Sequence, residues 1–198
     1  MEADEEPPGL RDRNKRAARD AIAAAALRIA IEQGPGGLKL VRVADIAAAA
    51  GVAPRTYNNY FASREEAICA FQADRAQRLG RALRARPAAE PLRAAVTEAA
   101  VTVFTDPEPD RAGLAMIMST PELRGEALKA FTMAEAPLAA AIAERTGARD
   151  PLTTDVQAAA IAAAVRVAGR HWLTVRTPAD FAGVLRAALR HIVLEEDS

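Results

Sequence analysis

The chain has 198 residues, and its 26 Lys and Arg balance 26 Asp and Glu, so its formal net charge is zero. Alanine supplies 50 of the residues, whereas aromatic residues make up only 4%. Ala is the strongest helix former and contributes little buried area. This composition therefore predicts an all-α protein and argues against a β-sandwich or barrel.

The same counts exclude several kinds of site. A single cysteine, Cys69, excludes an internal disulfide framework and a multi-thiolate metal site. No apolar run reaches the roughly 18 residues that a membrane span needs, and the acidic N-terminus is unlike a secretory signal. We therefore expect a soluble cytoplasmic protein that needs no metal or cofactor and does not contact a membrane.

Charge is distributed unevenly along the chain. Residues 11–64 contain ten Lys or Arg and four Asp or Glu, a net charge of +6, whereas residues 1–10 carry −4 and the remainder −2. A basic N-terminal segment joined to a nearly neutral body is common among nucleic-acid binders, although solvated arginines are also ordinary on helix faces.

The N-terminal part of the chain predicts four helices. Residues 1–10 are acidic and rich in proline, which predicts a disordered tail. A helix is expected over 13–33, ended by Gly34, followed by two short helices over 43–50 and 53–61 that are separated by Gly51. Ser63 and Glu66 form a capping-box pattern that should begin a long helix reaching about residue 86.

Proline divides the rest of the chain. Proline directly follows an acidic or hydroxyl residue in the pairs Glu90–Pro91, Asp106–Pro107, Thr120–Pro121, Asp150–Pro151 and Thr177–Pro178. Such pairs suit an N-cap followed by the first helical residue. They predict helices near 90–104, 110–119, 121–146, 151–175 and 178–195, with Pro137 kinking or splitting the third of these. The expected domains are 11–62 and 63–198.

Residues 42–61 have the form of a helix-turn-helix. Val43, Ile46 and Ala47 make the inner face of the first short helix, and Gly51 allows the turn. The second short helix carries side chains that can reach base edges or phosphates, namely Arg55, Thr56, Asn58, Asn59 and Tyr60. A solvated helix hairpin would show a similar pattern.

The full segment 46–66, IAAAAGVAPRTYNNYFASREE, resembles the DNA-binding domain of the tetracycline-repressor-like (TetR) family, and the resemblance extends over about residues 15–67. It implies that Arg55, Asn58 and Asn59 meet bases, and that Thr56, Tyr60, Arg64 and Arg42 contact the DNA backbone. Ala53 departs from the family's usual serine N-cap, and Asn58 stands where an aromatic residue is frequent. Tyr57 and Phe61 are expected to pack inward.

The resemblance also implies a C-terminal body that dimerises and encloses a small-molecule pocket. A face of small residues over 156–168 and an apolar stripe over 181–193 could pair with a second copy as a four-helix bundle. Both stripes could instead be buried inside one chain.

Bulky residues in the body are candidates for the pocket lining, namely Phe104, Met116, Ile117, Met118, Phe131 and Trp172. The same residues also suit an ordinary core, because few other large side chains are available. Arg166, Arg170 and Arg176 could neutralise an anionic head group, or they could form a solvated face.

No motif of an enzyme occurs in the sequence. We expect a ligand-responsive repressor that binds double-stranded DNA at a palindromic operator as a homodimer and is released by a small apolar or amphipathic effector. The alternative is a helical small-molecule carrier or protein-interaction module without sequence-specific DNA binding. These alternatives differ in salt dependence, because only the DNA binder should lose affinity steeply as salt rises.

Overall fold

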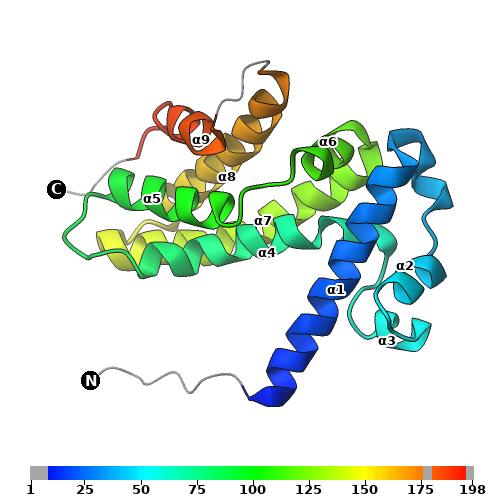
Figure 1. Ribbon diagram of the computed structural model, residues 1–198. Coiled ribbons are helices and arrows are strands. Elements are labelled where there is room, and N and C mark those ends of the chain that lie inside the picture. Colours follow the sequence, from blue (N-terminus) through cyan, green and yellow to red (C-terminus); the bar gives the residue numbers. More distant parts are fainter. Residues whose placement is uncertain (1–8, 176–179, 195–198) are drawn as a thin grey trace. The chain divides into compact units, whose positions relative to one another are not determined.

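The computed structural model describes residues 9–175 and 180–194, which are helical with no strand (Figure 1). This confirms the all-α fold class. The expected tail lies outside the described residues except for its last two, of which Leu10 already begins a helix. The elements are α1 (Leu10–Gln33), η1 (Pro35–Leu40), α2 (Val43–Ala49), α3 (Pro54–Asn58), α4 (Arg64–Arg84), α5 (Leu92–Thr105), α6 (Arg111–Ser119), α7 (Pro121–Thr146), α8 (Pro151–Thr174) and α9 (Phe181–Leu189).

The chain divides into two compact units, the first ending at Ala70 and the second beginning at Phe71. In the first unit α1 packs against η1 and α2, and α2 packs against α3 (Figure 1). Its fully buried side chains include Ile22, Val41, Ile46 and Tyr57. The 3-10 helix η1 was not predicted, because Gly34–Gly37 indicated only the end of α1.

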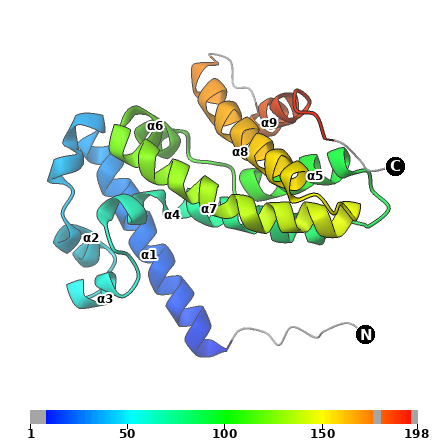
Figure 2. The same ribbon diagram turned by 180° about the vertical axis from the view of Figure 1, so that it is seen from behind.

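The second unit is a bundle in which α7 packs on α8, α8 on α9, and α5 on α9 (Figure 2). The short α6 contacts both α7 and α8. Most core residues of this unit belong to one continuous cluster, in which 11 alanines pack among larger side chains such as Phe104, Leu138, Ile161 and Trp172. Alanine at helix contacts allows close packing, because its side chain is a single methyl group.

Three of the five proline pairs behave as predicted or nearly so. Pro121 and Pro151 are the first residues of α7 and α8, and the Asp150 side chain accepts a hydrogen bond from the Leu152 amide. At the start of α5 the cap is Pro91 itself.

The expectation that Asp106 caps a helix beginning at Pro107 is wrong. Asp106 ends α5, whereas α6 is capped by Asp110, whose side chain accepts from the Ala112 amide. The pair Thr177–Pro178 lies outside the described residues, and α9 begins at Phe181 with Asp180 as its cap. An acidic residue can cap a helix without a following proline, so Asp110 and Asp180 left no signal in the proline pattern.

Pro137 does not split α7, which continues from Pro121 to Thr146. The proline lies where α7 meets α4, and a Cβ atom added to Gly80 of α4 would stand 2.9 Å from the Pro137 carbonyl oxygen. Such a distance leaves no room for a side chain. Gly80 therefore permits the two backbones to touch, which no other residue type would allow.

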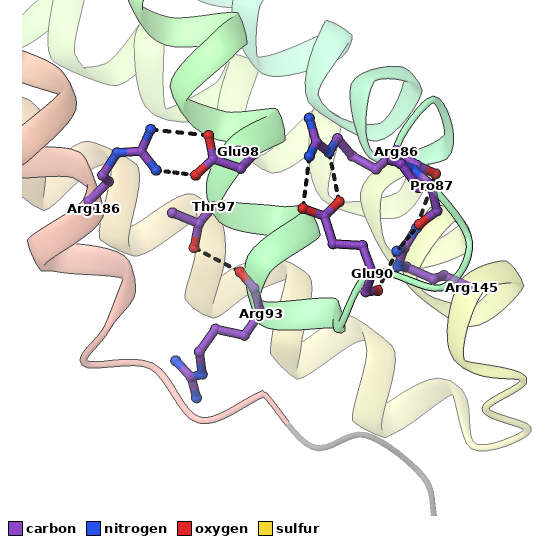
Figure 3. A network of polar contacts seen from close by, with 8 residues as sticks. All are labelled: Arg86, Pro87, Glu90, Arg93, Thr97, Glu98, Arg145 and Arg186. Carbon is purple, nitrogen blue, oxygen red and sulfur yellow. Dashed lines mark hydrogen bonds and ion pairs between the residues drawn. The ribbon is translucent and has the colours of Figure 1, made fainter.

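A network of polar contacts holds the ends of several helices of the second unit together (Figure 3). Arg86 and Glu90 form a bidentate pair with two hydrogen bonds of 2.7 Å. Arg145 of α7 donates to the carbonyl oxygens of Pro87 and Glu90, at 2.5 Å each. These contacts fix the segment between α4 and α5 against the C-terminal end of α7.

Replacing Gly80 with alanine should destabilise the protein by about 1–3 kcal/mol, because the added methyl group forces α4 away from α7. The matched control is Gly125→Ala, an exposed glycine within α7 whose added Cβ meets nothing within 4 Å. That variant should gain up to about 1 kcal/mol from helix propensity. Urea denaturation measures both free energies of unfolding, and equal effects at the two glycines would contradict the close contact.

Candidate nucleic-acid interface and ligand chamber

The helix-turn-helix is built from α2, a turn at Gly51 and α3. Ile46 and Ala47 are completely buried on the inner face of α2. Gly51 has φ +70, and the amide of Val52 donates to the Ala47 carbonyl at 2.9 Å. A positive φ strains any residue with a Cβ, so glycine is required at this turn. Val52, directly after the turn, is half-buried.

The second short helix is shorter than predicted, because α3 ends at Asn58 rather than Phe61. Asn59 and Tyr60 lie in the turn that follows, although the Phe61 amide still donates to the Tyr57 carbonyl at 3.1 Å. Ala53 is the N-cap and makes no side-chain cap bond. Because alanine rather than serine stands at position 53, the start of α3 has no side-chain cap.

Two aromatic residues anchor α3 to the first unit. Tyr57 and Phe61 are 1% and 2% exposed, with ring centroids 5.9 Å apart. The guanidinium of Arg19 on α1 lies 5.1 Å from the Phe61 centroid, a cation–π distance. This confirms the expected inward packing, which aims the opposite face of α3 at solvent.

Tyr57 also joins α3 to the start of α4. Its hydroxyl donates to the Ser63 carbonyl at 2.8 Å. The Ser63 side chain accepts from the Glu66 amide at 3.0 Å, and the Glu66 carboxylate accepts from the Ala62 amide at 2.7 Å. The predicted capping box is thus present with its second bond displaced by one residue. Burial, aided by the charges of Glu66 and Glu65, raises the pKa of Tyr57 to about 12.

The residues expected at DNA occupy one part of the first unit. Four of them are exposed, and Thr56 and Tyr60 are half-buried; the exposed residues are Arg42, Arg55, Asn58 and Asn59. Arg64 is also half-buried and has partners within the chain. Its Nε donates to Glu65 at 2.8 Å and its Nη1 to the Val41 carbonyl at 3.1 Å.

The second unit contains a cavity of about 270 Å³. All six helices α4 to α9 contribute to its wall, and its largest apolar lining residues are Phe104, Leu114, Ile117, Met118, Phe131 and Phe181. The rings of Phe104 and Phe131 stack with centroids 6.1 Å apart. Leu128, which is 49% exposed, also lines the cavity and marks its opening to solvent. We call this cavity the chamber.

Four of the six residues expected in the pocket line the chamber, namely Phe104, Ile117, Met118 and Phe131. Met116 and Trp172 do not. Met116 is buried beside Thr120, whose hydroxyl lies 3.8 Å from its sulfur. Trp172 packs on Phe181 with centroids 5.2 Å apart. Both side chains are therefore buried outside the chamber wall.

Sequence reasoning missed the polar residues of the chamber that lie on α4 and α7. Gln72, Arg75 and Arg124 are part of its wall. Arg75 is only 6% exposed, and its pKa is lowered by burial and by the charge of Arg78. A signal was available for two of them, because Gln72 and Arg75 fall between Ile68 and Leu79 on the buried side of α4. Arg176, expected near Arg166 and Arg170, lies outside the described residues.

Val167 and Ala168, at the end of the small-residue face over 156–168, lie in a surface groove between α8 and α9. This groove of about 500 Å³ is lined by Val167, Ala168, Val184, Ala188 and the two histidines His171 and His191. On α8, Val156 and Val167 are 59% and 45% exposed. The apolar stripe expected over 181–193 is divided, because Phe181, Leu185 and Leu189 of α9 are buried within the unit, whereas Val193 lies beyond the end of α9 and is 75% exposed.

Among residues 9–175 and 180–194, no group of three or more His, Cys, Asp or Glu residues is arranged to hold a metal ion. No helix within residues 9–175 and 180–194 is both long and apolar enough to cross a membrane.

One comparison with known proteins gives a match. The family model described as the MftR C-terminal domain, a C-terminal domain of the TetR family, matches residues 86–195, more than half of the chain. No curated protein matches the chain. The matched region contains α5 to α9, and therefore most of the chamber wall and the groove between α8 and α9.

Because Tyr57 is buried, the free energy of unfolding should fall as the pH becomes alkaline. Its folded pKa of about 12 lies above the ordinary value of 10.0, so its stabilising contribution is complete below pH 10 and is lost as pH rises through 12. Wild-type protein should therefore lose about 1–3 kcal/mol more than Tyr57→Phe over this interval, as measured by urea denaturation. Tyr60→Phe removes the other phenol of the chain and should not abolish this loss. Equal pH slopes for wild type and Tyr57→Phe would show that Tyr57 is not the titrating group.

Proposed function

The chain belongs to the TetR family, and on this premise we propose that it is a ligand-responsive repressor of transcription. It binds a palindromic operator as a homodimer and leaves the operator when a small apolar or amphipathic effector occupies the chamber. The observation that carries this proposal is the family match over the body together with the solvent-facing side of α3. The family assignment points to a regulator rather than to an enzyme.

The contacts to DNA follow from the exposed side chains. Arg55 and the amides of Asn58 and Asn59 can bond base edges in the major groove, where Arg pairs with guanine and Asn with adenine. We expect Thr56, Tyr60 and Arg42 to contact phosphate oxygens. For Arg64, the bonds from Nε and Nη1 leave its Nη2 for a phosphate. These intramolecular bonds hold the guanidinium in place, which reduces the entropy lost on binding.

The groove between α8 and α9 is the proposed dimer interface. Exposed Val156 and Val167 and the small side chains near them allow a second copy to approach closely. A two-fold pairing of α8 and α9 gives an isologous four-helix arrangement. The two α3 helices must then lie about 34–36 Å apart to enter successive major grooves. An effector that favours another spacing weakens operator binding by about 1–3 kcal/mol.

The first experiment is selection of random duplex DNA by the full-length protein, followed by sequencing. Enrichment of one inverted repeat would support a dimeric operator-binding regulator. Failure to enrich any sequence, together with an affinity that barely changes with salt, would overturn the proposal and favour a small-molecule carrier.

Two arginine variants separate base contacts from backbone contacts. Arg55→Ala should relax specificity at one or two base pairs of the selected site, at a cost of about 1–3 kcal/mol. Arg42→Ala should weaken binding to all sequences alike. It should also reduce the slope of log affinity against log salt concentration by about one. Binding titrations against the selected site and its point variants measure both effects.

Arg149→Ala, which removes an exposed arginine of the second unit, is the control and should change neither quantity. If Arg55→Ala and Arg42→Ala both bind like the wild type, α3 is not the recognition helix.

A further inference from the structure

The charges lining the chamber are all positive among the residues that the structure describes. Arg75, Arg124, Arg166 and Arg170 belong to its wall, and no Asp or Glu does. The four arginines lie at different depths: Arg124 and Arg170 are exposed, Arg166 is half-buried and Arg75 is buried. Apolar walls with little water strengthen the field of these charges. The chamber therefore attracts anions along its whole depth.

Several other arginines of the second unit have oxygen partners. Arg86 pairs with Glu90, and Arg186 pairs with both oxygens of Glu98 (Figure 3). Arg145 donates to main-chain carbonyl oxygens in the same network. Within the chamber wall, Arg75 donates from its Nη2 to the Pro107 carbonyl at 2.5 Å.

Arg166 is different. Its Nη1 is shielded from solvent and has no hydrogen-bond partner within the described part of the chain. Its guanidinium lies 5.7 Å from the centroid of the Phe131 ring, so the aromatic face offsets part of the charge but accepts no conventional hydrogen bond. A buried donor without an acceptor is costly, and such a group marks a site whose partner comes from outside the chain.

From this arrangement we infer that the chamber binds a small carboxylic acid whose ionised head group accepts a hydrogen bond from Arg166 Nη1. The apolar part of the ligand lies against Phe104, Ile117 and Met118. Arg124 and Arg170 near the opening attract the anion, and they do not need to be desolvated to do so. This inference rests on the proposed function only in taking the chamber as the effector site.

The volume limits the size of the ligand. About 270 Å³ equals the volume of roughly nine liquid water molecules. Octanoate has about that number of non-hydrogen atoms and is therefore a suitable probe. Octanol and octylammonium have the same chain with a neutral and a cationic head group, so the three probes differ only in head-group chemistry.

The test is isothermal titration of the full-length protein with each probe. Octanoate should bind at least about tenfold more tightly than octanol, and octylammonium should bind most weakly, because a charge-assisted hydrogen bond separates the three. Arg166→Gln should reduce octanoate affinity by about tenfold or more and leave octanol affinity unchanged. Arg149→Gln makes the same chemical change at an exposed site outside the chamber and should alter neither.

Equal affinity for octanoate and octanol, equal losses for both in Arg166→Gln, or no binding of octanoate would each overturn the inference. A misfolded Arg166→Gln protein is recognised by its far-ultraviolet circular dichroism, and Arg166→Lys then replaces it. Lysine keeps the charge, so octanoate should retain its preference over octanol in that variant. The selection of random DNA is carried out without ligand, so its result stands or fails independently of these titrations.

Discussion

Backbone contact between α4 and α7 is the constraint on which the second unit depends. Gly80 lies against the Pro137 carbonyl, where a Cβ would stand only 2.9 Å away. The chain has 50 alanines, whose small side chains suit close helix packing, but even an alanine would not fit in place of Gly80 at this contact. Dispersion contacts here form between backbones as well as side chains. Space remains where large residues replace alanine. The chamber is such a place, since Phe104 and Phe131 stack in its wall and hold the neighbouring helices apart.

In the first unit, large buried side chains hold the short helix α3 in place. A five-residue helix without a side-chain cap is too short to be stable alone. Tyr57 and Phe61 hold it by burying their rings, while Arg19 covers Phe61 and the Tyr57 hydroxyl bonds the Ser63 carbonyl. Because Tyr57 and Phe61 anchor α3 through its inner side, the polar side chains on its outer side are not needed to hold the helix in place.

Most helix positions could be predicted from the sequence, because periodicity, proline and glycine act locally. The errors have local causes too. Asp106–Pro107 was read as a helix start, but the capping residue is Asp110, four positions later. Of the kink or split expected at Pro137, the split does not occur, because α7 continues through this residue. Met116 and Trp172 are large and close in sequence to lining residues, yet they face the core, and composition cannot resolve which way a helix is turned.

By itself, the sequence determined an all-α chain, the position of the helix-turn-helix and the inward packing of Tyr57 and Phe61, since each follows from residue types within a few positions of one another. Only the tertiary structure decided which charges share the chamber. Arg75, Arg124 and Arg166 lie on α4, α7 and α8, and about 40 to 50 residues separate each from the next. Their common field, and the unsatisfied Nη1 of Arg166, exist because packing brings these helices around one cavity.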